Sequence, residues 1–236
     1  GCYFLTSIND GAKGEGRIFS SESEALLALD HDIIDLRAKI KVKTEKENKL
    51  IETSVGRTIF NRALPQDYQF LNKAMNQTDL RGTEAEIFHK YGEDAAVKFL
   101  DTIKDLGFHY ATMSGVSWGM DDLRIPEEKK QLVAEAEKKV EENQSLYEQG
   151  LLTEHERKTK AMEIWTTVKS KIEKIISTKF GKNESVYLMV DSKARGSWSV
   201  ATQLAGMRGL MVKPDGELME MPVKSCFKEG LSVLEY

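Results

Sequence analysis

The sequence has no long apolar run and no recognisable leader. None of its apolar stretches approaches the roughly 20 residues that a helix needs to cross a bilayer, which argues against a membrane-spanning helix. The amino-terminal residues lack the basic region and the long apolar stretch of a signal peptide. We therefore expect a cytoplasmic protein without a membrane partner. The chain starts at Gly1 and stops at Tyr236 within an expected helix start, so both ends look cut from a longer polypeptide.

Cysteine and histidine are both scarce. The two cysteines, Cys2 and Cys226, lie far apart in the sequence, and the four histidines are scattered. Neither residue type has the spacing of zinc ligands, and two distant cysteines do not make a disulfide framework. We expect this chain to bind no metal, and we expect both thiols to be buried in a reducing cytoplasm.

An excess of basic residues is also missing. With 34 Lys+Arg and 38 Asp+Glu the formal net charge is -4, whereas free-standing nucleic-acid-binding domains usually carry a basic excess. Charged residues make up 31% and hydrophobic residues 40% of the chain, which is typical of a folded globular or elongated helical protein. A chain of 236 residues can form one or two domains with a real core.

The first part of the chain, residues 1–64, predicts a small mixed domain. Ser21, with Glu24 three residues later, has the spacing of a capping box and predicts a short helix. Apolar and charged residues alternate in 36–43, which indicates a strand with one face in water. Two further segments are the strand candidate 2–8 and a second strand or strand-to-helix joint at 52–60.

Residues 65–125 predict a helical domain built from short pieces. One helix is expected to begin at Thr83 and to end at Tyr91 and Gly92, because glycine commonly follows a helix. The apolar residues after it suit a packed helix, which we expect to stop at Gly107.

Residues 126–180 predict two helices of about 22 residues each, or roughly 33 Å, paired as an antiparallel hairpin. Pro126 precedes the first helix, a favourable place for its fixed φ. Thr153 and Glu156 have the spacing of a capping box at the start of the second. The remaining surface positions of both helices are mostly Glu and Lys. The hairpin is therefore either a solvated structural element or a docking site for other proteins. The expected seam has coiled-coil spacing and consists of Ala161, Trp165, Val168, Ile172 and Ile175.

Residues 191–211 combine glycine hinges with two arginines. Gly196 and the pair Gly206 and Gly209 flank a short helix-like run, and glycine permits tight turns and close backbone approach. Arg195 and Arg208 carry planar guanidinium groups suited to phosphate, although each could instead form a structural salt bridge. A loop of this kind is more often functional than a plain connection.

The same stretch reads DSKARGS at 191–197 and QLAGMRGLM at 203–211, while KGEGR stands at 13–17 and AKIKV at 38–42. In these motifs the chain resembles the bacterial DNA-directed RNA polymerase β′ subunit, with a resemblance that spans nearly the whole chain. It implies an α+β fold that is mostly α, with a small β-rich amino-terminal part. The implied parts are a mixed pore-region domain (1–64), a helical funnel domain (65–125), an antiparallel coiled-coil rim hairpin (126–180), and an F-loop-like segment of loops and strands leading into the bridge helix (181–236).

In that family the hairpin stands on the rim of the secondary channel, where substrates enter, and transcription factors dock on it. Lys158 and Thr159 replace the usual Tyr-Asn pair of the family pattern, so the alarmone binding attributed to that surface is not carried over. The residues to which the resemblance assigns factor docking are Leu151, Thr153, Glu156, Arg157 and Lys160.

The resemblance also implies groups close to the substrate. Arg195 and Arg208 are the candidates for a position near an incoming triphosphate or the bridge helix, and Gln203, Leu210 and Met211 would pack against the bridge helix and the trigger loop. The family has a glycine where this chain has a lysine at position 193. If that glycine has a positive φ, the lysine costs on the order of 1 kcal/mol.

RNA synthesis uses two metal ions held by clustered carboxylates, and the family motif that supplies them is absent from this chain. The acidic pair Asp121 and Asp122 is interpreted as the lead-in to a helix. The resemblance thus implies DNA-templated RNA synthesis by an enzyme that uses Mg²⁺, with the ligands outside this chain, which alone should be inactive. The implied partners are the β, α, ω and sigma subunits, the DNA template, the RNA and secondary-channel transcription factors.

Two other functions stay open from the residues alone. The chain could be a free-standing helical-hairpin module for protein interaction, without a catalytic partner chain. A small phosphate-binding enzyme is the weakest hypothesis, because no nucleophile–base pair or metal cluster is visible.

Overall fold

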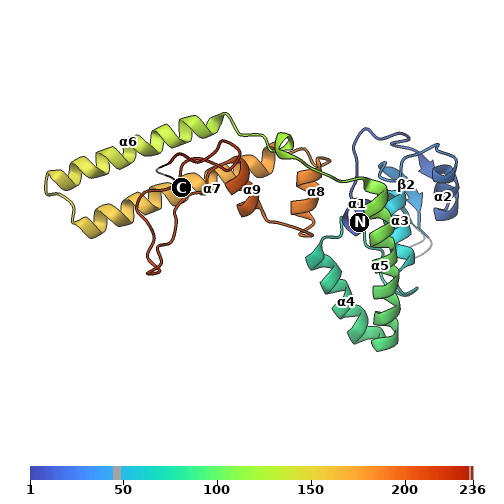
Figure 1. Cartoon of the computed structure of the whole chain (residues 1–236). Coiled ribbons are helices and arrows are strands. Elements are labelled where there is room, and N and C mark those ends of the chain that lie inside the picture. Colours follow the sequence, from blue (N-terminus) through green and yellow to red (C-terminus); the bar gives the residue numbers. More distant parts are fainter. Residues whose placement is uncertain (45–48, 234, 236) are drawn as a thin grey trace. The chain divides into compact units, whose positions relative to one another are not determined.

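The computed structural model describes residues 1–44, 49–233 and 235, and the chain divides into two compact units (Figure 1). The first unit comprises Gly1–Ser117 with Ser192–Ala194, and the second comprises Trp118–Asp191 with Arg195–Tyr236. Helices dominate, and a small sheet holds the strands assigned within the described ranges. The predicted α+β, mostly α class is therefore confirmed.

The sheet of the first unit has the strand order β1-β2-β3. β1 (Ile18–Phe19) runs parallel to β2 (Ile40–Lys43), and β2 pairs antiparallel with β3 (Leu50–Thr53). Successive residues of β2 are alternately buried and exposed, as the alternating sequence predicted. One face of the sheet therefore covers a core and the other faces water.

Helix α2 (Glu22–Asp30) packs near this sheet and begins where its capping box predicted. The Ser21 hydroxyl accepts a hydrogen bond from the backbone N–H of Glu24 at 3.2 Å, which satisfies one of the free donors of the first turn. Helix α3 (Val55–Arg62) follows β3 almost directly, so the strand-to-helix joint is confirmed.

The prediction of a strand at residues 2–8 is wrong, because α1 (Cys2–Thr6) is a helix. Cys2, Leu5 and Thr6 are buried together, which is the i, i+3, i+4 pattern of one helix face. A short apolar run does not distinguish a strand from a buried helix. Packing against α3 and α5 (Glu93–Ser114) decides the outcome.

Two predicted boundaries in the helical part are also wrong. Helix α4 (Gln77–Tyr91) begins well before Thr83, because the Asn76 side chain accepts from the Asp79 N–H at 3.0 Å and caps it. Helix α5 continues through Gly107 and ends at Gly115, whose φ of 57° is left-handed. A left-handed glycine is a common end of a helix.

The second unit contains the predicted hairpin of α6 (Glu128–Glu148) and α7 (Glu154–Lys179), which Figure 1 shows side by side. Thr153 and Glu156 form the predicted capping box: each side chain accepts a hydrogen bond from the other residue's backbone N–H. The antiparallel pairing follows because only the five residues 149–153 connect the two helices.

The buried seam of α7 differs from the prediction at one residue, because Ile176 is buried in place of the expected Ile175. Two causes contribute: α7 also packs against α9 (Trp198–Ala205), and a straight helix drifts away from a strict heptad seam. Short helices complete this unit: the 3-10 turn Met120–Asp122 and α8 (Ser185–Asp191). The shared core of the unit is lined by Leu123, Ala136, Trp165, Val168, Ile172, Ile176, Phe180, Val186, Ala205 and Met207.

The four-part division of the chain stays a prediction. The expected start of the bridge helix at 231–236 falls partly on positions 234 and 236, which lie outside the described residues. Of the described residues in this range, 233 and 235 lie in turns, 231 and 232 have no assigned secondary structure, and none is helical.

Replacing Asn61 should destabilise the first unit. Its buried side chain donates to the Leu71 carbonyl at 2.9 Å and accepts from the Leu71 N–H at 2.7 Å. Asn61→Ala leaves both backbone groups without this partner, which costs roughly 2 to 4 kcal/mol of unfolding free energy. Urea denaturation measures this change. The exposed Gln66 is the matched control, since Gln66→Ala should change stability by no more than about 0.5 kcal/mol. Equal stability of both variants would contradict the prediction.

Candidate functional site

The segment after α8 is anchored on α7 by a glycine. A Cβ atom on Gly206 would lie 2.7 Å from both Ile172 Cγ2 and Ile176 Cδ1, so only a residue without a side chain allows the end of α9 to sit so close to α7. Met207 follows at 0% exposure. This close approach fixes the start of the segment that follows α9 against α7.

Residues 208–223 then form an arm that folds back on itself. Gly209 and Val223 exchange two backbone hydrogen bonds of 2.9 and 3.0 Å, and Gly209 has a φ of 87° that favours glycine. Further out, the Met219 N–H donates to the Met211 carbonyl at 2.7 Å. The arm is thus a short ladder held mainly by backbone bonds.

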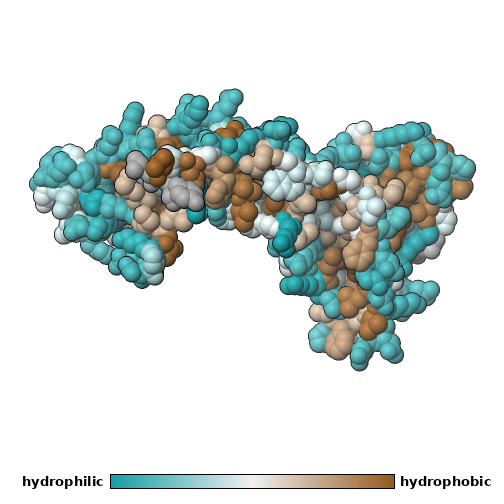
Figure 2. Space-filling view, viewed as in Figure 1, coloured by the Kyte–Doolittle hydropathy of each residue, from teal (hydrophilic) through white to brown (hydrophobic). Residues whose placement is uncertain are grey.

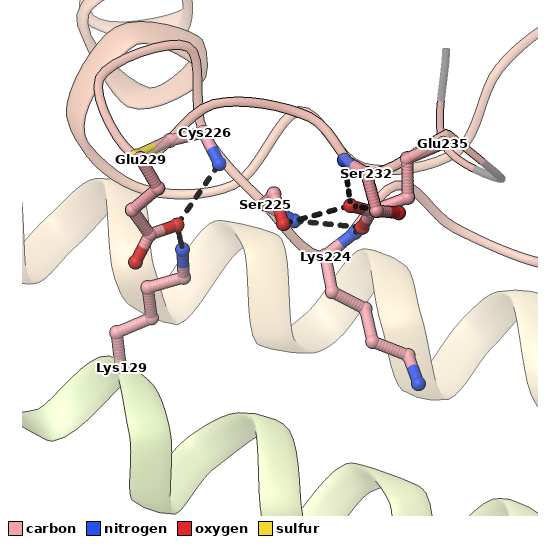
Figure 3. Close-up of polar contacts among 7 residues, drawn as sticks. All are labelled: Lys129, Lys224, Ser225, Cys226, Glu229, Ser232 and Glu235. Carbon is pink, nitrogen blue, oxygen red and sulfur yellow. Dashed lines mark hydrogen bonds and ion pairs between the residues drawn. The ribbon is translucent and has the colours of Figure 1, made fainter.

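Charged pairs tie the carboxyl-terminal segment to the hairpin. Lys129, near the start of α6, is buried and pairs with Glu229, which also accepts from the Cys226 N–H at 3.1 Å (Figure 3). Further along α6, Lys224 Nζ lies 2.6 Å from Glu137 Oε1. A buried ammonium group needs such a partner, because an unpaired charge there would be very costly.

A carboxylate organises the end of the described chain. Glu235 accepts from the N–H groups of Lys224 and Ser225 at 3.0 and 3.1 Å, and from the Ser225 and Ser232 hydroxyls at 2.8 and 3.0 Å (Figure 3). Although desolvation raises the pKa of Glu235, the hydrogen bonds from Ser225 and Ser232 outweigh it and lower this pKa to about 2. The carboxylate therefore closes the loop from 225 to 235.

At the outer end of the hairpin, Arg157 pairs with Glu220 of the arm. Both Nη atoms bind the two carboxylate oxygens, one of them at 3.1 Å, in the fork geometry typical of arginine. The guanidinium also lies over the Tyr147 ring, 5.4 Å from its centroid. The hydrogen bond to Glu220 raises the pKa of Arg157.

The structure places the residues predicted to lie near substrate as follows. Arg195 is exposed on the turn before α9, and within the described part of the chain its guanidinium forms no ion pair. The Arg208 guanidinium lies 5.2 Å from the centroid of Phe227, so a ring takes the place of the salt bridge considered for it. Gln203 and Met211 accept backbone bonds from Phe227 and Met219, and Leu210 packs on the core.

Lys193 has a φ of 58°, so the position where the family has glycine is left-handed in this chain. Its ammonium group donates to Thr78 Oγ1 at 3.1 Å. This contact belongs to the first unit, and it partly offsets a backbone cost on the order of 1 kcal/mol. Lys193 therefore connects its turn to the start of α4.

The predicted docking residues are spread over the hairpin tip. Leu151 is 67% exposed, and Figure 2 shows hydrophilic residues over most of this end. Thr153 and Glu156 are engaged in the capping box, and Arg157 is held by Glu220. Lys160 lines a groove of 590 Å³ between α6 and α7, together with Leu132, Lys139, Asn143, Leu146 and Ile164.

The described residues do not offer a site that fits Mg²⁺. In them, no three His, Cys, Asp or Glu side chains are placed to share a metal. Asp121 and Asp122 lie in the 3-10 turn before α6, where Asp122 accepts from the Gly119 N–H at 2.7 Å. The pair forms a separate 3-10 turn, and five residues lie between it and the start of α6 at Glu128. The helices of the described ranges also include none that could span a membrane.

Both cysteines are buried and free, as predicted. Burial is the largest influence on each, and it raises the pKa of the Cys2 and Cys226 thiols. Neither thiol is thus favoured as a nucleophile.

Sequence reasoning missed the charged residues that hold the segment in place, namely Lys129, Glu137, Glu220, Lys224, Glu229 and Glu235. They occur in strongly polar stretches, where a charged residue is usually solvated. The one available signal was Ser232 with Glu235 three residues later, which has the spacing of a capping box.

Two family models match the chain in succession. RNA polymerase Rpb1, domain 3, matches residues 1–123, and RNA polymerase Rpb1, domain 4, matches residues 126–230. The first match alone covers more than half of the chain and the two together nearly all of it, which places the chain among RNA polymerase proteins. The chain belongs to the RNA polymerase Rpb1 family.

Curated relatives agree with this assignment. The chain is 40% identical over 256 residues to "DNA-directed RNA polymerase subunit beta'" of Acidothermus cellulolyticus, covering 100% of the chain and 20% of the relative. It is 41% identical over 236 residues to the protein of that name in Desulforamulus reducens, again with 100% and 20% coverage. For Clostridioides difficile the identity is 41% over 251 residues, with 100% and 22% coverage. The chain thus spans about a fifth of the length of these relatives.

Adding one methyl group at Gly206 should disturb the contact between α9 and α7. Because the new Cβ would lie 2.7 Å from two isoleucine methyl groups, Gly206→Ala should destabilise the second unit by roughly 1 to 3 kcal/mol. Thermal unfolding followed by tryptophan fluorescence measures the loss. Gly119→Ala is the matched control, because nothing lies within 4 Å of a Cβ there. If both variants unfold alike, the close approach is not required.

The Glu235 carboxyl should titrate far below an ordinary glutamate. Its pKa is about 2 in the folded chain against a reference value of 4.5, so its stabilising effect is complete above about pH 4.5 and is lost as the pH falls through about 2. An NMR titration of this carboxyl gives the midpoint directly. Ser225→Ala should raise the midpoint by removing a donor, and an unperturbed midpoint near 4.5 in the unmodified chain would refute the hydrogen-bond network.

Proposed function

We propose that the chain forms part of the β′ subunit of a DNA-directed RNA polymerase and contributes to DNA-templated RNA synthesis. The observation that carries the proposal is the succession of two family domains over residues 1–123 and 126–230. The names of the relatives, each matched over 100% of this chain, support it. A free-standing hairpin module would not require both domains in this order.

In this proposal the hairpin lines the secondary channel and offers a docking surface for transcription factors. Its support is geometric: a long pair of helices ends in an exposed tip, with Leu151 and Lys160 accessible on it. Arg157 would be reached by a docked protein only in competition with Glu220. The other polymerase subunits (β, α, ω and sigma), the template DNA and the RNA are the proposed partners, and the proposed cellular location is the cytoplasm.

The segment that begins at Arg195 would support nucleotide addition from beside the reacting groups. Arg195 is exposed and forms no ion pair within the described ranges, so its charge is available to an anion such as a triphosphate. Arg208 would stabilise the fold of this segment through its contact with the Phe227 ring. The described residues hold no cluster of metal-binding carboxylates, and in this proposal the chain on its own would not polymerise RNA.

Arg195→Ala in the assembled polymerase should weaken nucleotide binding. Loss of a charge-assisted contact to phosphate costs about 1.5 to 3 kcal/mol, so the apparent KM for nucleotides should rise roughly ten-fold or more. Steady-state RNA synthesis at varied nucleotide concentration measures it. Lys182→Ala, which removes an exposed charge of the same unit, is the control. An unchanged KM and rate would assign Arg195 a structural role.

A further inference from the structure

The arm, residues 208–223, has few internal contacts that could fix its position against the hairpin. Several of its apolar side chains are largely exposed, with values of 60% for Val212, 49% for Leu218 and 77% for Met221. Its two described backbone bridges, Gly209 with Val223 and Val212 with Leu218, are isolated. A short two-stranded ribbon without a core is marginally stable in water, so contacts with the hairpin must fix it.

The Arg157–Glu220 pair supplies that contact at the outer end. The two side chains are 17% and 31% exposed, and Arg157 is supported from behind by the Tyr147 ring. The backbone carbonyl of Arg157 also accepts from Asn143 Nδ2 at 2.8 Å, which fixes the residue to α6. A bidentate pair that is partly removed from water and held on both sides is stronger than an ordinary surface pair.

A second pair in the same arm shows the contrast. Lys213 and Glu217 approach to only 3.9 Å and are 47% and 79% exposed. Such solvent-exposed pairs contribute little to stability. The two glutamates of the arm therefore differ: Glu220 forms a well-ordered pair with Arg157, whereas Glu217, three residues earlier, forms only a weak exposed pair.

We propose that Glu220 is a positioning residue that acts through Arg157 and couples the outer hairpin to the segment bearing Arg208. The backbone ladder of the arm connects Glu220 to the Gly209–Val223 bridge, and Arg208 stands directly before this bridge. A protein that docks at the tip and competes with Glu220 for Arg157 would release the arm from the hairpin. Conversely, a conformational change in the arm would change the position of Arg157 at the tip. The functional half of this inference rests on the function proposed above.

Hydrogen exchange in the full 236-residue chain tests the structural half. Glu220→Gln should speed exchange of the Met219 and Val223 amides on the order of ten-fold, whereas the control Glu217→Gln should leave them unchanged. Combining Arg157→Gln with Glu220→Gln should add nothing to Arg157→Gln alone. Equal exchange in Glu220→Gln and the unmodified chain would overturn the proposal.

RNA synthesis by the polymerase assembled with the full-length subunit tests the coupling. Glu220→Gln should lower kcat about 2- to 30-fold with little change in the KM for nucleotides, in contrast to Arg195→Ala. The charge-swapped variant, Arg157→Glu with Glu220→Arg, should recover part of this loss, since it restores the pair.

The two experiments distinguish a failure of the proposed coupling from a failure of the proposed polymerase function. Faster exchange with an unchanged kcat would overturn the coupling and leave the polymerase function intact. If the enzyme with the unmodified segment makes no RNA, the proposed function fails, while the exchange experiment still decides whether Glu220 holds the arm.

Discussion

The second unit depends on the burial of one helix from two sides. Helix α7 packs against α6, and α9 also packs on it where Gly206 approaches Ile172 and Ile176. A solvated two-helix hairpin buries one narrow seam, whereas α7 gains a second apolar contact from the segment that returns along it. The returning segment in turn derives its position from α7. Hairpin and segment are consequently one folded body, and neither is an appendage of the other.

Local signals with a definite stereochemical cause were reliable guides to this fold. The capping residues Ser21 and Thr153 marked helix starts because their side chains replace missing backbone partners. The alternation in β2 was equally clear, and four of the five predicted seam residues are buried, namely Ala161, Trp165, Val168 and Ile172. The failures at residues 2–8 and at Gly107 have a different origin. There, packing between distant segments decides the backbone conformation, and local sequence patterns do not reveal which segments meet.

The candidate site was only partly predictable for a related reason. Glycines and arginines in 191–211 attracted attention because few other residues can take their places. Glu220 and Glu229 are chemically ordinary, and their importance comes from a partner about 63 or 100 residues away that removes them from water. Even Arg157, which the resemblance assigned to docking, is found bound to the protein's own arm. Ion pairs between distant segments are the part of such a site that a sequence conceals.

The turn at Gly150 has a practical consequence. It is closed by local bonds, from Gly150 N–H to the Tyr147 carbonyl at 2.9 Å and from Leu151 N–H to the Leu146 carbonyl at 3.0 Å, and Leu151 is 67% exposed. Extra residues there would disturb no buried contact, and exposed turns of this kind tolerate insertions well. The turn is accordingly a suitable attachment point for a fluorescent dye or an epitope tag, from which movements of the neighbouring arm could be followed by energy transfer.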